Sequence, residues 1–565
     1  MMTGKGVFVE KESRVRNDPD LIFISQSEIV NYDGYAKLPV ERVELYKNLI
    51  YPRMVYLKGA FRSHCDVINY LRTGMFWSDS VPQSRREMLS IWNLPGFAGP
   101  HIANYLKAYD LNTCVINNFD AQGDLLDEIY RKCDSKPVVA ISTTFHLNYS
   151  EITRIVKQLR AKHPGILIVL GGAFINGEMA ADDPKALIKV MTKLGIDYAV
   201  YSFNSEADLK DLLIAHKNKR PLDTVRNLIY RESSDGAIAF KITEKCWNAP
   251  LISEVPDHWE RLDLPFVNNT IQIRTSSGCP FSCAFCSYPK TAGGHFAMPV
   301  AMAEQQLQSI LRRPNIKNII FLDDTFNVPQ ERFKQLCQMF RKYTFEWFSF
   351  LRVQYINEEI VKLMKDSGCR AVYLGVESAN DQILRNMNKR VTRADFERGI
   401  ALLNKYDITM MVAFVIGFPG ETRQTISDNK DFIEKNGIQF YTLKEFFYIE
   451  NTPIHRDREQ FGLTGMGNNW QHNTMSSAQA SEYKMHMFRE IKSVFVDPDT
   501  SLWYLAYLYD QGFTMSEIAD VQRDINKIML SQMDGRFSDD DPLFGQLARK
   551  LHQRGRHANK LAVIK

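Results

Sequence analysis

Three cysteines stand close together in the stretch SSGCPFSCAFCSYPK: Cys279, Cys283 and Cys286. The chain has nine cysteines, and no fourth one is near these three in the sequence. Thiolates at this spacing bind a metal ion or an iron–sulfur cluster. Because three protein ligands leave one coordination position open, the pattern predicts a centre that takes part in chemistry.

Two kinds of centre fit the spacing. A structural zinc site is one, with His295 as the fourth ligand. The other is an iron–sulfur cluster, and the surrounding sequence favours it. The cysteines stand at the start of a long series of strand–helix units, whereas a structural zinc site usually holds together a small domain. A bacterial-type ferredoxin needs Cys-x-x-Cys-x-x-Cys and a fourth cysteine before proline, which this stretch does not have.

The spacing Cys-x-x-x-Cys-x-x-Cys resembles the signature of the radical S-adenosylmethionine (SAM) superfamily. The resemblance implies that the three thiolates hold three irons of a [4Fe-4S] cluster and that the fourth iron binds the amino and carboxylate groups of SAM. It also implies that Phe285, the aromatic residue before the last cysteine, packs near the adenine. Cleavage of SAM at the reduced cluster would then give a 5′-deoxyadenosyl radical.

Further motifs follow in the order that this family has. IKNIIFLDDTFN predicts a strand that ends at Asp323 and Asp324, where the resemblance places the methionine end of SAM. FEWFSFLRVQYI predicts the next strand, with Arg352 at its end.

Two more predicted strands end in polar or glycine residues. CRAVYLGVESAND ends at Glu377, which the resemblance assigns to the ribose hydroxyls of SAM. ITMMVAFVIGFPGET ends with Gly417 and Glu421, similar to a later SAM-contacting strand of the family. Each carboxylate alone could cap a helix or be a solvated charge, but four landmarks in this order favour the family. We therefore expect a partial or complete α/β barrel over residues 268–445, with its site at the carboxyl ends of the strands.

Upstream, short apolar runs alternate with amphipathic helices, which predicts an α/β fold with a doubly wound parallel sheet. The expected strands are MLSIWN (88–93), NTCVIN (112–117), PVVAIST (137–143), ILIVLGG (166–172) and IDYAVYS (196–202).

Ligands of such sheets bind beyond the carboxyl ends of the strands. Ser142, Thr143, Gly171 and Gly172 are at these ends, where hydroxyls can bond to a ligand and glycines let the backbone approach it. The same residues also make good turns, so the pattern alone leaves both interpretations open.

Residues 89–216 resemble the cobalamin-binding domain that precedes many radical enzymes, through STT, VLGGAF and DYAVYSFNSEADLKDLL. The resemblance implies a cobalamin cofactor. Families that ligate cobalt from below carry Asp-x-His-x-x-Gly after the first strand, whereas this chain has Asn93, Pro95 and Ala98 at the aligned positions. Cobalamin would therefore have no histidine ligand from this loop, as in many cobalamin-dependent radical methylases.

The predicted organisation has five parts: an N-terminal extension (1–87), the cobalamin-binding-like domain (88–220), a hairpin and linker (221–267), the radical SAM barrel (268–445), and a substrate-covering loop with a mainly helical C-terminal region (446–565).

Composition sets outer limits on the function. A hydrophobic content of 45% and a charged content of 24% are typical of a globular protein, and a net charge of +4 on 565 residues does not indicate a nucleic-acid partner. No apolar run is long enough to predict a membrane span or a signal peptide. The other six cysteines stand singly, which is typical of reduced thiols, so we expect a cytoplasmic protein.

Taken together, residues 89–445 resemble cobalamin-binding radical SAM enzymes, specifically the class B methyltransferases. The resemblance implies methyl transfer from methylcobalamin to an unactivated carbon, or a phosphinate phosphorus, of a small biosynthetic intermediate, with flavodoxin or ferredoxin as electron donor. The stretch YIENTPIHRDREQFGLTG bears a weaker resemblance to the phosphinate P-methyltransferase group. Two alternatives stay open: rearrangement or cyclisation without methyl transfer, and a non-enzymatic corrinoid or iron–sulfur sensor.

Overall fold

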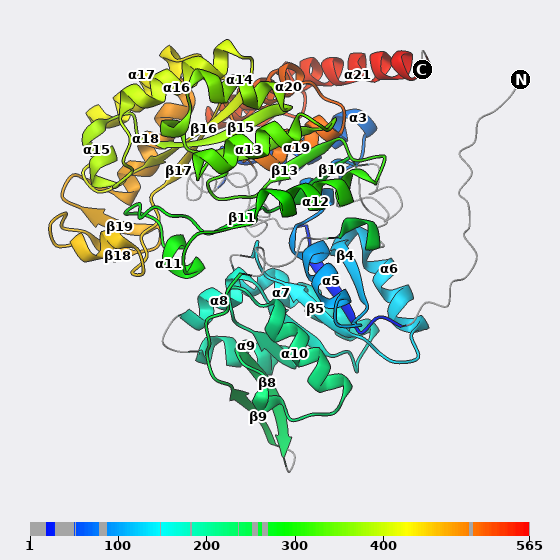
Figure 1. Cartoon of the computed structure of the whole chain (residues 1–565). Coiled ribbons are helices and arrows are strands. Elements are labelled where there is room, and N and C mark those ends of the chain that lie inside the picture. The colour runs from blue at the N-terminus through cyan, green and yellow to red at the C-terminus, as the bar shows by residue number, and fades with distance from the viewer. Residues whose placement is uncertain are drawn as a thin grey trace, which may run out of the picture. The chain divides into compact units, whose positions relative to one another are not determined.

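The computed structural model describes residues 18–28, 50, 52–77, 88–146, 148–180, 184–234, 237–250, 258–262, 269–496 and 501–563. The chain divides into two compact units (Figure 1). Unit 1 comprises residues 1–25, 101–116 and 122–246, and unit 2 comprises residues 26–100, 117–121 and 247–565.

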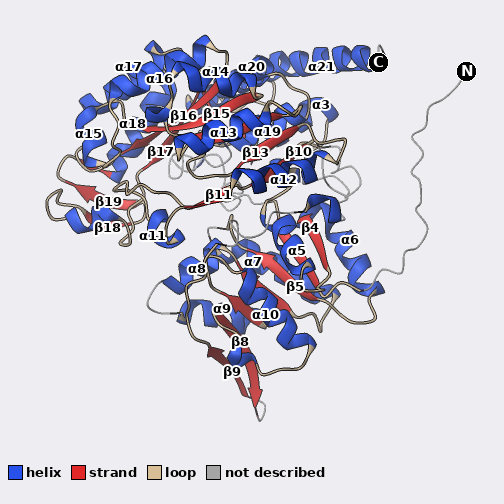
Figure 2. Ribbon diagram, viewed as in Figure 1, coloured by secondary structure: helices blue, strands red, loops and turns tan. Residues whose placement is uncertain are grey.

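Figure 2 shows strands β4, β5, β8 and β9 of the first sheet in red. The full strand order of this sheet is β4-β1-β5-β6-β7-β8-β9. Its strands are β1 (Leu21–Gln26), β4 (Thr113–Asn118), β5 (Val138–Ser142), β6 (Ile168–Gly171), β7 (Tyr198–Val200), β8 (Leu228–Ser234) and β9 (Ala237–Ile242). The pairs β1–β5, β5–β6 and β6–β7 are parallel, and the hairpin β8–β9 adds antiparallel strands next to β7. The predicted doubly wound fold and the predicted hairpin are confirmed, and the hairpin extends the sheet.

The strand expected at residues 88–93 is wrong. Ile91–Asn93 form a 3-10 helix (η3), whose start is capped by the Ser90 side chain. The strand that belongs beside β5 is β1, in the segment assigned to an N-terminal extension. Side chains of Asn117 and Gln26 bind the carbonyls of residues 92–94 and hold the segment in a turn. This turn precedes α5, but 71 residues separate α5 from β1.

Helices follow the strands of this sheet as predicted. They are α5 (Ala98–Lys107), α6 (Phe119–Lys132), α7 (Tyr149–Lys162), α8 (Ala173–Ala180), α9 (Lys185–Leu194) and α10 (Glu206–Lys217), with a 3-10 turn η4 (Leu222–Thr224). The start of α7 shows why the sequence folds this way: the Asn148 side chain accepts the backbone N–H of Ser150 and satisfies a free donor of the first turn.

The second sheet has seven parallel strands in the order β10-β13-β14-β15-β16-β17-β21. They are β10 (Thr270–Ile273), β13 (Asn318–Phe321), β14 (Glu346–Leu351), β15 (Cys369–Glu377), β16 (Thr409–Ile416), β17 (Phe440–Glu445) and β21 (Val494–Phe495). Within the described chain no pairing joins β10 to β21, so the sheet is a partial barrel. Its strands are nearly all buried, as expected for a parallel sheet covered on both faces.

Helices alternate with these strands and end in a helical C-terminal region. They are α11 (Tyr288–Ala292), α12 (Val300–Leu311), α13 (Gln330–Phe340), α14 (Glu358–Asp366), α15 (Asp381–Asn386), α16 (Arg393–Lys405), α17 (Arg423–Lys435), α18 (Ser477–Glu490), α19 (Ser501–Asp510), α20 (Met515–Met533) and α21 (Pro542–Val563). The 3-10 turns of this unit are η6 (Trp259–Arg261), η7 (Val353–Tyr355) and η8 (Pro453–Asp457).

Small elements complete unit 2. The three-stranded sheet β18 (Thr464–Met466), β19 (Asn469–His472) and β20 (Met475–Ser476) lies in the predicted covering loop. The hairpin β2 (Val55–Leu57) and β3 (Ala60–Arg62) is followed by α3 (His64–Thr73). Tyr56 of β2 exchanges two hydrogen bonds with the Gln532 side chain of α20, so the N-terminal part of this unit packs on its last helices.

In the part of the chain that the structure describes, no helix has both the length and the hydropathy that a membrane crossing needs.

Candidate functional site

The three clustered cysteines lie on the loop that follows β10, as predicted. The start of this loop forms β11 (Ser276–Ser277), which pairs with β12 (Phe296–Ala297). Gly278 has a φ of 82°, and a Cβ at this position would lie 1.7 Å from the carbonyl oxygen of Gly294. Only glycine allows the backbone to approach so closely, so Gly278 fixes the path of the chain into the first cysteine.

The structure brings the three thiols together and pairs none of them in a disulfide. Burial raises the pKa of Cys286 to about 11, and the neighbouring Cys283 and Cys279 raise it further. Burial also raises the pKa of the Cys279 thiol. Thiols of this kind ligate iron only after losing their protons, so cluster assembly here is coupled to proton release. Three mutually interacting thiols fit a cluster that takes one thiolate per iron.

The zinc alternative lacks the geometry that it needs. Among the described residues, no three His, Cys, Asp or Glu side chains lie close enough to hold a single metal ion. The Nε2 atom of His295 is buried and has no hydrogen-bond partner in the described chain, and burial lowers the pKa of this imidazole. In the described chain, His295 and the three thiols are therefore not gathered into a four-ligand site.

Asp323 holds the beginning of the cysteine loop. Its carboxylate accepts the backbone N–H of Thr275 at 2.9 Å, the Thr275 hydroxyl at 2.7 Å and the Ser276 hydroxyl at 2.6 Å. The residue is fully buried. These three bonds use both carboxylate oxygens, so the Asp323 side chain serves to hold the cysteine loop.

Asp324 differs from its neighbour. Its Oδ2 atom is buried and has no hydrogen-bond partner among the described residues. Burial raises the pKa of Asp324, whereas Arg274 and Tyr288 lower it. A buried carboxylate oxygen without a partner is costly unless a ligand supplies one. Asp324 is thus the residue of the predicted pair with one carboxylate oxygen that the described chain leaves without a hydrogen bond.

Arg352 reaches the thiols. Its Nη1 atom lies 3.7 Å from the Sγ of Cys283, and its guanidinium carbon lies 3.7 Å from the ring centroid of Phe281. Its Nη2 atom donates to the carbonyl oxygen of Lys389 at 2.5 Å. A fixed, buried cation beside a thiol stabilises the thiolate form, which is the form that binds iron.

Glu377 and Phe285 lie on either side of a lysine that sequence reasoning missed. Lys389 donates to Oε1 of Glu377 at 2.8 Å, and its Nζ lies 5.8 Å from the ring centroid of Phe285. Phe285 also meets Phe418 edge to face, with centroids 6.3 Å apart. The predicted adenine and ribose residues therefore occupy neighbouring positions. Nothing in the sequence marks Lys389, which stands in a basic turn between two helices.

Gly417 and Glu421 form a closed turn after β16. The carboxylate of Glu421 accepts the backbone N–H groups of Gly417 at 2.6 Å and Phe418 at 3.2 Å, and Asn429 donates to its other oxygen at 3.3 Å. Burial raises the pKa of Glu421 to about 8. A Cβ on Gly417 would lie 2.4 Å from the Trp470 ring. Both residues shape the turn, and Glu421 uses its carboxylate inside it.

The predicted covering loop contacts both motifs. The backbone N–H of Ile454 donates to the carbonyl of Ala284 at 2.9 Å, between two of the cysteines. His472 bonds through Nε2 to the carbonyl of Gly417 at 3.2 Å, and the Trp470 ring stacks on His472. Residues 446–476 thus lie against the cysteine loop and the glycine turn.

In the first sheet, two of the four predicted binding residues are used to join strand ends. Both the backbone N–H and the hydroxyl of Thr143 donate to the carbonyl of Gly171, at 2.7 and 2.8 Å. Gly172 has a φ of 106°, and a Cβ there would lie 2.9 Å from the Thr143 nitrogen. Contacts within the protein therefore account for Thr143 and Gly172, and no ligand is needed to explain either residue.

Ser142, Gly171 and His146 lie at the same edge. The hydroxyls of Ser142 and Thr144 lie 3.3 Å apart, and a Cβ on Gly171 would meet only the carbonyl of Val200, at 3.6 Å. His146 is buried, and neither ring nitrogen has a hydrogen-bond partner within the described residues. Burial lowers the pKa of His146 to about 4, so the ring is neutral at pH 7. Unsatisfied polar atoms beside an exposed hydroxyl fit a large ligand with a polar rim, such as a corrinoid.

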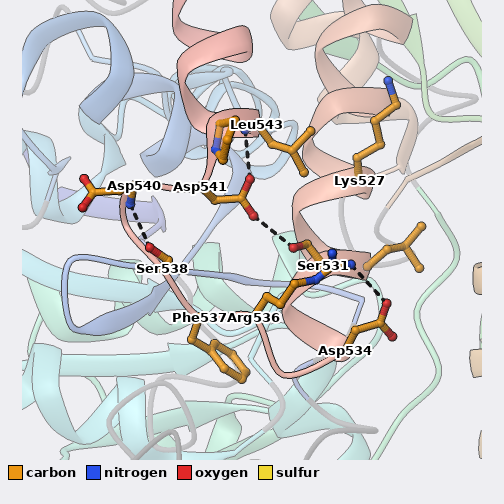
Figure 3. A pocket seen from close by; sticks show the side chains of 11 residues that line it. Lys527, Ser531, Asp534, Arg536, Phe537, Ser538, Asp540, Asp541 and Leu543 are labelled. Atoms are coloured by element: carbon orange, nitrogen blue, oxygen red, sulfur yellow. Dashed lines mark hydrogen bonds and ion pairs between the residues drawn. The ribbon is translucent and has the colours of Figure 1, made fainter.

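A separate hollow of about 710 Å³ lies at the turn between α20 and α21 (Figure 3). Its acidic groups are used in local bonds: Asp541 accepts from the Ser531 hydroxyl at 3.0 Å and the Leu543 N–H at 2.9 Å, and Asp534 pairs with Arg489. These bonds therefore stabilise the turn between the two helices. None of the predicted site residues lines the hollow.

The sequence of this chain is similar to those of several known proteins. The Radical SAM superfamily matches residues 273–433, which contain the cysteine loop and strands β13 to β16. The uncharacterized methyltransferase PH0819 of Pyrococcus horikoshii is 27% identical over 334 residues, which are 55% of this chain and 67% of that protein. The bacteriochlorophyllide d C-12(1)-methyltransferase of Chlorobaculum tepidum is 27% identical over 188 residues, 32% of this chain. That match spans only 41% of the relative's length.

Two solved structures share the fold over most of the chain. The radical SAM methyltransferase TsrM from Kitasatospora setae, with cobalamin and a [4Fe-4S] cluster bound, has a TM-score of 0.52 at 15% identity and covers 92% of this chain and 100% of its own. The cobalamin-dependent SAM radical enzyme OxsB has a TM-score of 0.52 at 13% identity and covers 97% of this chain and 82% of its own. These likenesses establish the fold, and the family match establishes that residues 273–433 form a Radical SAM superfamily region.

Proposed function

We propose that this radical SAM enzyme is a cobalamin-dependent methyltransferase that acts on an unactivated carbon, or a phosphinate phosphorus, of a small biosynthetic intermediate. One observation carries the proposal: a single chain contains a three-thiol loop at the end of a parallel sheet and, before it, a second parallel sheet with open polar groups at its carboxyl edge. TsrM, which binds cobalamin and a [4Fe-4S] cluster, shares the fold over 92% of the chain.

In this proposal each unit holds its own cofactor. Cys279, Cys283 and Cys286 would hold the cluster in unit 2, and Ser142 and Gly171 would line the cobalamin site in unit 1. When bound, the cluster and SAM supply radical chemistry, and cobalamin supplies the methyl group.

The chain's own groups would bind and orient SAM beside the thiols. Asp324 offers a buried carboxylate oxygen to the methionine amino group, Glu377 accepts the ribose hydroxyls, and Phe285 packs on the adenine. Arg352 would stabilise the thiolates by charge. The covering loop, held to the cysteine loop by the Ile454 N–H, would limit the access of water to reactive species.

The partners follow from the chemistry. Radical SAM enzymes need a reductant, and we infer that a flavodoxin or a ferredoxin fills this role. Methyl transfer and SAM cleavage leave distinct products, so the substrate need not be known to test the reaction class.

The test uses anaerobically purified full-length protein, reconstituted with iron and sulfide and supplied with cobalamin. Iron and cobalt are measured per chain, and the reduced protein is then incubated with SAM and candidate intermediates. We expect both metals to be retained, and both 5′-deoxyadenosine and S-adenosylhomocysteine to form during turnover. Protein that retains zinc and no iron would overturn the proposal, and so would protein that never cleaves SAM.

A second candidate is cobalamin-dependent radical chemistry without methyl transfer. The likeness in fold to OxsB, a cobalamin-dependent SAM radical enzyme, supports this candidate as well. The same experiment separates the two: 5′-deoxyadenosine without S-adenosylhomocysteine would support this second candidate.

A further inference from the structure

We propose that Lys389 is a positioning residue for SAM: its ammonium group orients Glu377 toward the ribose, while its backbone helps to hold the cysteine loop. The inference rests on the SAM site of the proposed function. It assigns a task to a residue that neither the sequence motifs nor the family comparison single out.

The segment Met387–Arg390, between α15 and α16, binds the cysteine loop directly. The backbone N–H of Ala284 donates to the carbonyl of Met387 at 2.8 Å. The Asn388 side chain donates to the carbonyl of Ser282 at 2.9 Å. The segment therefore contacts the loop between its first and last cysteine.

The backbone of this segment is held in an uncommon conformation. Asn388 and Arg390, on either side of Lys389, have φ values of 50° and 56°, in the left-handed region that residues other than glycine rarely adopt. Such conformations persist where the surrounding contacts fix them, and they are frequent at functional sites. Arg352 supplies one such contact, from its Nη2 to the Lys389 carbonyl. Lys389 is thus fixed by the same arginine that reaches the Cys283 thiol.

The side chain of Lys389 points to the other half of the site. Lys389 and Glu377 form an ion pair at 2.8 Å, with side-chain exposures of only 9% and 13%. Gly375 makes room for this pair, since a Cβ there would lie 2.3 Å from Oε1 of Glu377 and 3.2 Å from Nζ of Lys389. The close packing leaves the carboxylate few alternative orientations.

This arrangement divides the two oxygens of Glu377 between two tasks. Oε1 is engaged by Lys389, so Oε2 is presented to a ligand as the second acceptor. The ammonium also compensates a largely buried carboxylate, which is costly to leave without a cation. Because the same ammonium lies near the Phe285 ring, the ribose and adenine positions are set by one residue.

The test compares Lys389→Met with the wild type in reconstituted holoenzyme. The methionine keeps the length of the side chain and the backbone bonds but loses the charge. We expect iron content like that of the wild type and SAM binding weaker by roughly tenfold to a hundredfold, measured by equilibrium dialysis and by the SAM-induced change in the electron paramagnetic resonance spectrum of the reduced cluster. Lys405→Met is the matched control, because Lys405 pairs with Glu358 on the surface, and it should bind SAM as the wild type does.

A double-mutant cycle shows whether Lys389 acts through Glu377. If it does, the double variant Lys389→Met/Glu377→Gln should bind SAM about as weakly as Glu377→Gln alone, and Lys389→Arg should recover part of the affinity. Fully additive losses would overturn the inference, as would unchanged SAM affinity or the loss of iron in Lys389→Met. Wild-type protein that holds iron but binds no SAM would overturn the proposed function, and this inference with it.

Discussion

The two sheets use the polar residues at their strand ends in different ways. After β13 and β14, Asp323 and Arg352 reach other elements and assemble the cysteine loop. In the first sheet, Thr143 bonds to the neighbouring strand end and Gly172 packs against it, while a Cβ on Gly171 would meet only the carbonyl of Val200. A motif therefore locates a site, but the groups that a ligand can use are those that the protein has not already satisfied.

The largest effect should come from removing the thiols. We expect the Cys279→Ala/Cys283→Ala/Cys286→Ala variant to lose all of the iron, about four atoms per chain for one [4Fe-4S] cluster, because no thiolate remains to hold it. Metal analysis after reconstitution measures this. Cobalt should stay bound, since unit 1 supplies its own groups to cobalamin, and loss of both metals would contradict independent sites.

Variants of Asp323 and Asp324 test whether the first residue holds the cysteine loop and the second binds a ligand. Asp323→Asn replaces an acceptor of three hydrogen bonds with an amide that opposes at least one donor, so we expect a loss of about 3 kcal/mol in the free energy of unfolding, together with poor iron uptake. Asp324→Asn should leave stability nearly unchanged and weaken SAM binding. Urea denaturation and dialysis against SAM measure the two effects, and equal effects of the two variants would remove the distinction.

The glycine pair makes the same test in the first sheet. Gly172→Ala places a methyl group 2.9 Å from the Thr143 nitrogen at a positive φ, so we expect a loss of about 2 kcal/mol in stability. Gly171→Ala should cost little stability and reduce cobalamin retention, because its open side would face the ligand. Thermal unfolding and bound cobalt report these outcomes, and a Gly172→Ala protein as stable as the wild type would refute the structural role.

A further prediction concerns the pH dependence of stability. Burial raises the pKa of Glu421 from its ordinary value of 4.5 to about 8, so the folded state binds this proton more tightly than the unfolded state. Its contribution is fully present below pH 4.5 and is lost as pH rises toward 8, at no more than about 1.4 kcal/mol per pH unit. Glu421→Gln should flatten the stability profile in this window. A slope equal to that of the wild type, measured by urea titration at several pH values, would show that Glu421 does not cause it.

The sequence predicted the second sheet well because its signals are local. Each strand from β13 to β16 is a short apolar run that ends in a polar or glycine residue, and the three cysteines have a fixed spacing. The order of these runs along the chain is also their order in the sheet.

What the sequence could not show depends on distant contacts. Leu21 of β1 pairs with Val138 of β5, and no local pattern reveals a parallel partner so far along the chain. The different tasks of Asp323 and Asp324 depend on which hydroxyls lie near them in three dimensions. Lys389 lies in a turn without periodicity, so only the folded structure connects it to Glu377.

The bonds between Tyr56 and Gln532 have a consequence for the synthesis of the protein. These two residues are 476 positions apart, so the hairpin β2–β3 leaves the ribosome long before its partner helix exists. A ribosome adds on the order of 10 residues per second, which leaves this hairpin without α20 for most of a minute. The contact between β2 and α20 can form only after α20 has left the ribosome, so the loading of iron into the cysteine loop of unit 2 is expected to follow the synthesis of this helix.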